Sequence, residues 1–546
     1  MAIFLYKIGR FSYRRRWLVA GLWVVLLALA GAGAATLSGT MSNSFSIPGT
    51  EAQQAIDQLS ARFPQAHVGG ASARVVFVAP DGATLTTPAL RAAVEETVAA
   101  LKGAPKVAAV TDPYQTKSFS PDGRYAIAQV SYAVQSTQLT AGDRAALLHG
   151  LDAGRAAGLT VEAGGDALRA KPDTGATEVI GVLVAALVLV ITFGSLVAAG
   201  LPLLTAVAGV GVGLSGIAIA SRFLDINANS LILALMLGLA VGIDYALFIV
   251  SRYRHEVRER GAGPEAAGRA VGTAGSAVVF AGLTVIIALA GLSVVGIPLL
   301  RSMGLAAAAV VAVAVLVAVT LLPALLGLFG RRATASRLFR RPVPDPESAG
   351  GPTPMGERWA RFVTRYRLPV LLVALAGLVT VAVPTTHLRL GLPDDGTAQA
   401  GTTQRKAYDL IREGFGPGFN GSLTVVVSAS GSAQAAATQA AATIRKLPDV
   451  VVVAGPTLSA DGATALLTVI PASAPNDPAT TGLVNAIRGH RAALRQATGA
   501  DIAVTGQTAL NIDVSGKIGS ALLPYLLLVV GLAFLLLMLV FRSVLV

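Results

Sequence analysis

The sequence contains no cysteine, and this absence excludes disulfide bridges, thiolate metal sites and cysteine nucleophiles. Charge is also scarce, because charged residues make up 13% of the 546 residues whereas a soluble domain usually carries about 25%. Aromatic residues account for 5% of the chain and hydrophobic residues for 53%. This composition predicts an integral membrane protein.

The signatures of common enzymes are missing as well. There is no G-x-x-x-x-G-K-[ST] phosphate-binding loop and no G-x-S-x-G nucleophile elbow. The five histidines are scattered without metal-binding spacing. We therefore expect no enzymatic activity, no metal and no cofactor, and we expect any work that the protein does to draw on an ion gradient.

Long apolar runs are what the sequence has in abundance. About 20 apolar residues span a bilayer, and eight runs approach or exceed that length. The first follows Lys7, Arg10 and three further arginines, and its length favours a retained anchor over the alternative, a signal peptide. The runs cover residues 17–36, 177–199, 201–220, 230–251, 273–295, 303–328, 368–387 and 518–541.

The distribution of charge predicts the orientation of these spans. With the N-terminus in the cytoplasm, the cytoplasmic segments hold 20 of the 43 Lys and Arg residues against 6 acidic residues. Residues 37–176, on the outer side, hold 11 basic and 12 acidic residues. The formal net charge of +13 thus reflects membrane orientation, and we expect no nucleic-acid binding. Arg outnumbers Lys by 35 to 8, which indicates a GC-rich bacterium, and we expect the chain to lie in the inner membrane of that bacterium.

Two long outer segments have the same predicted order of elements: strand, helix, strand, strand, helix, strand. In the first, SARVVFVAP and RYAIAQVSYAV are typical of strands. In the second, GSLTVVVSA and ATALLTVIPA take the corresponding places. We expect two α+β, ferredoxin-like βαββαβ porter domains outside the membrane.

The chain is also predicted to contain an internal repeat, which is how many secondary transporters are built. The sequence FGSLVA from Phe193 resembles FRSVLV from Phe541, 348 residues later. A complete repeat would continue beyond Val546, so we expect the second half to be truncated. The predicted parts are residues 1–36 (N-terminus and helix 1), 37–176 (first porter domain), 177–328 (helices 2 to 6), 329–367 (cytoplasmic linker), 368–387 (helix 7), 388–516 (second porter domain) and 517–546 (helix 8).

One carboxylate stands inside a predicted span. Asp244 lies 14 residues after Ser230 and 8 before Arg252, roughly 21 and 12 Å along a helix. A charge at that depth costs about 2.5 to 3.5 kcal/mol, so it normally faces a polar bundle interior. We interpret Asp244 as a protonation site, with a neutral, hydrogen-bonded packing role as the alternative. Tyr245 points about 100° away, and it is either a relay partner or an interior aromatic residue.

Other features near this position have simpler interpretations. Gly238 and Gly242, four residues apart, form a small-xxx-small face for helix packing. The glycines of the third span, Gly209, Gly213 and Gly216, are likewise expected to be packing residues. The charged run 252–258 is expected to be the solvated cytoplasmic end of its helix.

Together, GIDYALFIVSRYRHE, GLTVIIALAGL, the paired outer segments and the repeat resemble the MMPL (mycobacterial membrane protein large) family of the resistance-nodulation-division superfamily. The resemblance implies twelve helices, two porter domains and proton-driven export of lipids. It also implies a relay in which Asp244 and Tyr245 match the first of two Asp-Tyr pairs. The second pair would fall near position 592, beyond Val546.

The resemblance favours a proton-motive-force-driven exporter of lipids or amphiphiles across the inner membrane. A Patched-like or sterol-sensing receptor and an auxiliary membrane protein for secretion remain alternatives. Expected partners are the amphiphilic substrate, membrane lipids, and either further copies of the chain or cell-envelope accessory proteins.

Overall fold

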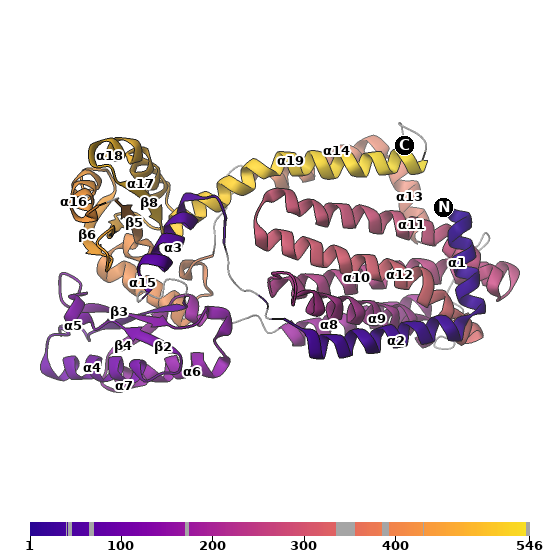
Figure 1. The fold of residues 1–546 in the computed structure, drawn as a ribbon. Helices are drawn as coiled ribbons and strands as arrows, with labels where there is room; N and C mark the ends of the chain where they lie inside the picture. Colours follow the sequence, from indigo (N-terminus) through magenta and orange to yellow (C-terminus); the bar gives the residue numbers. More distant parts are fainter. Residues whose placement is uncertain are drawn as a thin grey trace. The chain divides into compact units, whose positions relative to one another are not determined.

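The computed structural model describes residues 1–39, 41, 46–64, 70–169, 174–334, 355–384, 393–429 and 431–541. The chain divides into two compact units (Figure 1). The helical unit comprises Met1–Phe45, Asp173–Arg389 and Ser520–Val546, and the α/β unit comprises Ser46–Pro172 and Leu390–Gly519. Most of the predicted cytoplasmic linker and the repeat residues after Phe541 lie outside the described residues.

The helical unit contains helices long and apolar enough to cross a membrane. Among the described residues, α2, α9, α10, α11, α12 and α19 meet that condition, and the pair α13 and α14, bent by 96°, would make a seventh span. Helix α8 adds a shorter apolar stretch, Val179–Phe193. The bounds are α1 Ala2–Arg14, α2 Arg16–Leu37, α8 Thr174–Phe193, α9 Leu196–Ala220, α10 Asn229–Arg260, α11 Pro264–Gly291, α12 Pro298–Thr334, α13 Met355–Arg365, α14 Arg367–Ala382 and α19 Gln507–Phe541.

The break between α8 and α9 differs from the sequence prediction. We expected the second span to run from 177 to 199, but α8 ends at Phe193 and α9 begins at Leu196. Gly194 has φ +61°, a left-handed conformation that ends a helix and that glycine adopts without strain. The Ser195 hydroxyl then accepts a hydrogen bond from the Ala198 N–H and caps α9. Local capping, which hydropathy alone does not report, therefore sets this boundary.

Helix α1 is a further element that the apolar runs did not predict. Its buried residues, Leu5, Gly9 and Ser12, recur at helical spacing and face α11 and α12. At Gly9 a side chain would meet Val271 of α11 at 2.8 Å, so the glycine permits close contact. Arg10 pairs with Glu265 at the start of α11 at 3.0 Å. The first residues of the chain thus pack against the bundle.

The first half of the α/β unit is an antiparallel sheet in the order β2-β3-β1-β4. Its central strand β1 is buried on both faces. Val75 and Phe77 pack against the helices on one face, whereas Val76 and Val78 belong to a separate cluster on the other. The elements are β1 Ser72–Val78, α4 Pro88–Lys102, β2 Val107–Val110, α5 Pro113–Thr116, β3 Tyr125–Tyr132, α6 Ala141–Gly150, α7 Asp152–Ala156 and β4 Thr160–Gly164.

The second half repeats this arrangement with the order β6-β7-β5-β8. Val425 and Val427 of β5 face α16 and α17, and Val426 points into the opposite cluster. The elements are β5 Leu423–Ser428, α16 Ala433–Ile444, β6 Val450–Leu458, β7 Thr464–Pro471, α17 Pro478–Gly489, α18 Arg491–Thr498 and β8 Asp501–Thr505.

Within the α/β unit, each half contributes one helix that packs on the sheet of the other half. Helix α3 (Glu51–Arg62) precedes β1 in the chain, yet its Ala55 and Leu59 pack on Val426 of β5. Helix α15 (Thr403–Phe415) precedes β5, yet its Ala407 and Ile411 pack on the first sheet. This reciprocal exchange covers the second face of both sheets.

Candidate functional site

The glycine face of α10 fixes which residues of that helix point into the bundle. A side chain at Gly238 would meet Val310 of α12 at 2.5 Å, and one at Gly242 would meet Ala206 of α9 at 3.1 Å. Tyr245, three residues further on, lies on the same side as Gly242 and is 8% exposed. Its ring and hydroxyl are near Gly282 of α11. The tyrosine is therefore held inside the bundle by α11.

Asp244 lies on the opposite side of α10 and is exposed. Two residues separate it from Gly242, which corresponds to a rotation of about 200° around the helix. It shares its side with Met236 and Phe248, which are 56% and 62% exposed, and with Ala240 between them. The described helices do not cover this side of α10, so the expectation that Asp244 faces a polar bundle interior stays a prediction. The phase set by the glycines places Asp244 and Tyr245 on different sides of α10.

The C-terminal end of α10 carries a buried charge cluster where we expected a solvated run. Glu256 is only 2% exposed. Its carboxylate forms ion pairs with Arg252 and Arg260 at 2.9 Å each and with Arg269 of α11 at 4.0 Å. The signal was present in the sequence, because arginines stand four residues before and after Glu256 and can reach it on one helix face. Three cations compensate for burying this carboxylate.

Arg254 links this cluster to α8. Its guanidinium is 7% exposed, donates a hydrogen bond to the Phe193 carbonyl at 3.0 Å and stacks 5.2 Å from the centre of the Phe193 ring. It therefore satisfies a carbonyl at the end of α8 that no further turn of helix can reach. Through Arg254, the C-terminal ends of α10 and α8 are held together.

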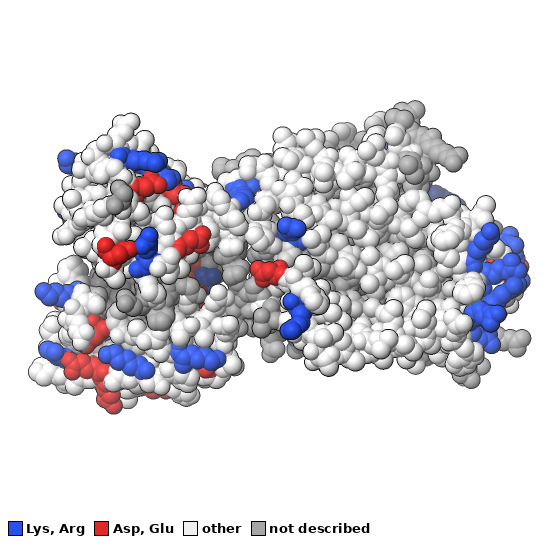
Figure 2. All heavy atoms as spheres, in the orientation of Figure 1, with Lys and Arg blue, Asp and Glu red and all other residues white. Residues whose placement is uncertain are grey.

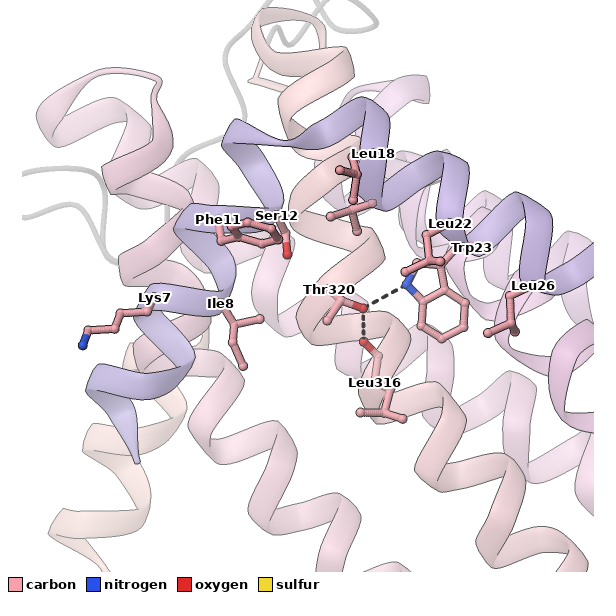
Figure 3. A pocket seen from close by; sticks show the side chains of 11 residues that line it. Lys7, Ile8, Phe11, Ser12, Leu18, Leu22, Trp23, Leu26, Leu316 and Thr320 are labelled. Carbon is pink, nitrogen blue, oxygen red and sulfur yellow. Dashed lines mark hydrogen bonds between the residues drawn. The ribbon is translucent and has the colours of Figure 1, made fainter.

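Basic residues gather at this end of the helical unit, and the sides of the unit are almost free of charge (Figure 2). A cavity of about 540 Å³ lies near this end between α1, α2 and α12. Lys7 stands at its edge and its walls are apolar (Figure 3). The Trp23 indole N–H donates to the Thr320 hydroxyl at 3.0 Å, which joins α2 to α12.

Neither this cavity nor the larger one described below is lined by Asp244. Among the described residues no three His, Asp or Glu side chains come together as metal ligands would. What distinguishes the helical unit chemically is one carboxylate halfway along a 32-residue apolar helix, together with a buried ion cluster at that helix's end.

These features define a multi-pass membrane protein, mostly helical, with two small antiparallel sheets. The model of the MMPL family matches residues 44–370 and 400–546. The chain belongs to the MMPL family of membrane transporters.

Three relatives illustrate the family. Membrane protein YdfJ of Bacillus subtilis is 39% identical over all of this chain and 74% of its own length. The mycolic acid-containing lipids exporter MmpL11 of Mycolicibacterium smegmatis is 31% identical over 97% of this chain and 57% of its own. The heme uptake protein MmpL11 of Mycobacterium tuberculosis is 31% identical over 98% of this chain and 57% of its own. The chain thus spans between about half and three quarters of the length of these relatives.

Proposed function

We propose that this protein is a transporter, and not an enzyme, that uses the proton gradient to export lipids or other hydrophobic or amphiphilic molecules. Relatives named as a lipid exporter and as a heme uptake protein both handle hydrophobic cargo, which supports the substrate class. Export is favoured over uptake because the resemblance of the α10 sequence to the MMPL family implies proton-driven export.

The observation that carries the proposal is the position of Asp244. A carboxylate halfway along an apolar span has a high cost when ionised, and protonation removes most of that cost. The face of α10 that bears Asp244 therefore changes its preferred surroundings each time a proton binds or leaves. We propose that this change drives the movement of α10 against its neighbours, with Tyr245 as the partner on the bundle side.

The α/β unit fits the role of the porter. We propose that its two halves are ferredoxin-like domains that arose by duplication, and their equal strand orders support this. We also propose that both face the outside of the cell while the N-terminus lies in the cytoplasm. Further copies of the chain or cell-envelope accessory proteins would then meet the protein on its outer side.

Replacing the carboxyl without changing its size tests the proposal. In vesicles with an imposed pH gradient, Asp244→Asn should lower the transport of a fluorescent lipid at least tenfold, because the amide cannot ionise. Tyr245→Phe should have a smaller effect, since only a hydroxyl is lost. Glu259→Gln, at an exposed position near the end of the same helix, is the matched control and should transport at the wild-type rate.

A packing role for Asp244 predicts the opposite result. An amide and a protonated acid satisfy similar hydrogen bonds, so Asp244→Asn would then transport at the wild-type rate. Reversing the gradient separates export from uptake, because the direction of lipid movement relative to proton flow gives the sign of coupling. Transport that is independent of the gradient in the wild type would refute proton coupling.

A further inference from the structure

The larger of the two cavities described here in the helical unit lies at the end where α9 stops and α12 begins. Its volume is about 760 Å³, within the range of roughly 300 to 1,000 Å³ typical of small-molecule sites. The walls come from the last turns of α9, the connection from α9 to α10, the turn that joins α11 to α12, and the first turns of α12.

The cavity lies beyond the close contact between α9 and α12. Along one side of α9, a side chain at Gly213 would meet Val310 of α12 at 2.8 Å, and one at Gly209 would meet Val317 at 3.5 Å. At Gly216 an added side chain would meet nothing within 4 Å. We expected all three glycines to be packing residues, but Gly216 opens into the cavity.

The interior is apolar and its mouth is charged. Ile217, Ile297 and Leu305 are among the apolar lining residues, and the charged ones are Asp225 and Arg301. The lining extends along α12 from Arg301 to Val313, a distance of about 18 Å at the rise of an α-helix. That depth is slightly more than half of a hydrocarbon core about 30 Å thick, which is the depth of one leaflet.

We propose that this cavity binds one lipid whose acyl chain fills the apolar interior and whose head group offers a phosphate to Arg301 and an N–H donor to Asp225. The two rim charges carry the head-group assignment, since a guanidinium recognises phosphate and a carboxylate recognises an ammonium group. A head group with both charges matches both side chains. The inference rests on the proposed function in one respect: in the proposed topology the cavity opens to the outer leaflet, where cargo for export would enter.

Binding is tested with phosphatidylethanolamine that carries a photoactivatable acyl chain, added to phosphatidylcholine vesicles that contain the protein. Labelled peptides should come from residues 212–226 and 297–313. Gly216→Leu fills the cavity without a steric conflict and should reduce labelling at least fivefold. Gly200→Leu places the same side chain on α9, also with nothing within 4 Å, and should label like the wild type. Equal labelling of the two variants would overturn the site.

Head-group variants test the second part of the inference. Arg301→Gln should reduce labelling by the phosphatidylethanolamine probe and leave labelling by a diacylglycerol probe unchanged, because diacylglycerol has no phosphate. Asp225→Asn should reduce labelling by phosphatidylethanolamine but not by a phosphatidic acid probe, which has no ammonium group. Should either variant fail to discriminate between its two probes, the assignment of that rim charge is wrong.

The binding assay is independent of the proton relay. Asp244→Asn should be labelled like the wild type, since Asp244 does not line the cavity. Loss of transport in Asp244→Asn with no labelling of the cavity in the wild type would remove the lipid site and leave proton coupling standing. Labelling of the cavity in the wild type, together with a wild-type transport rate in Asp244→Asn, would support the lipid site and refute proton coupling through Asp244.

Discussion

At the scale of single residues, small side chains decide how closely the membrane helices approach. Gly238 lies between Val310 of α12 and Val210 of α9, and even a Cβ atom there would come within 2.5 and 2.9 Å of their methyl groups. Valine side chains are too short and stiff to move aside by rotation alone. The helices themselves would have to separate.

Gly238→Leu should therefore destabilise the helical unit. Forcing extra carbons into a packed core costs about 1 to 3 kcal/mol, so the midpoint of thermal unfolding in detergent should fall. Gly200→Leu is the control, because its side chain has open space. Circular dichroism measures both midpoints, and an unchanged midpoint for Gly238→Leu would show that α10 and α12 tolerate a wider spacing.

The position of Asp244 opposite the glycine face of α10 could have been predicted from the sequence. The sequence gives the phase of Gly238 and Gly242, and a rotation of about 100° per residue then places Asp244 opposite and Tyr245 beside them. The burial of Glu256 was harder to predict from the sequence, because it also depends on an ion pair with Arg269 of α11. Contacts between different helices or strands are the feature that is hardest to predict from a single sequence.

At the scale of elements, capping groups tie helices to sheets in the α/β unit. Asp143 forms a capping box with Thr140 at the start of α6. Its carboxylate also accepts a hydrogen bond from Lys106, which directly precedes β2, at 2.8 Å. The hydrogen bonds from Lys106 and Thr140 lower the pKa of Asp143 from 3.8 to about 2. One carboxylate thus connects a helix to the edge of its sheet.

The depressed pKa predicts the pH range in which this connection matters. A carboxyl with a lower pKa in the folded state stabilises fully above its unfolded pKa, and the effect is lost as pH falls from about 4 towards 2. At pH 6, Asp143→Asn should speed hydrogen exchange in residues 141–150 about threefold, the size typical of a partly exposed ion pair.

The two proteins should become equal near pH 2, where the wild-type carboxyl is itself becoming protonated. Asp122→Asn, in the turn before β3, is a control whose effect should stay local to residues 119–125. A difference at residues 141–150 that persists unchanged below pH 2 would contradict the assignment.

The exchange of α3 and α15 makes the two sheets interdependent. Without α15, Val76, Val78 and Tyr125 of the first sheet would lose their cover, and an exposed apolar sheet face promotes aggregation. Residues 46–172 produced alone should therefore aggregate, whereas co-production with residues 390–519 should give a soluble complex. Ile411→Asp in the second segment should prevent rescue, because it puts a charge where the first sheet needs an apolar side chain.

A soluble and monomeric 46–172 segment would argue against this interdependence. The matched variant Asp409→Asn lies on the same helix at an exposed position and should leave rescue intact. The exchange itself was not predictable from the sequence. Helices α3 and α15 are short and amphipathic, and periodicity gives the apolar face of such a helix but not the sheet that it covers.

At the scale of the whole molecule, the number of membrane crossings is constrained by the α/β unit. Its two halves belong to one compact unit, so the chain must cross the membrane an even number of times between residues 172 and 390. Four long helices, α9 to α12, and the pair α13 and α14 give only five crossings. Among the described residues, we therefore predict that helix α8, whose 20 residues correspond to about 30 Å, supplies the sixth. The apolar runs predicted this span, although its described apolar stretch is short.

This parity predicts which side of the membrane each connection faces. Thr86, Ser432 and Phe223 should lie outside and Ala262 inside, in agreement with the basic residues gathered near the connection from α10 to α11 (Figure 2). Because the chain has no cysteine, each position can carry a single cysteine as a unique label. In intact cells a membrane-impermeant maleimide should label Thr86→Cys, Ser432→Cys and Phe223→Cys, and it should reach Ala262→Cys only after permeabilisation.

Phe223 and Ala262 make this test sensitive to α8. Phe223 is 77% exposed at the end of α9, and Ala262 is exposed between α10 and α11, so access to the reagent does not limit either. If α8 did not cross the membrane, both positions would change sides while Thr86 stayed outside. Labelling of Ala262→Cys in intact cells together with protection of Phe223→Cys would then place the basic end of the bundle outside. That outcome would refute the proposed topology, in which the N-terminus lies in the cytoplasm and the α/β unit outside.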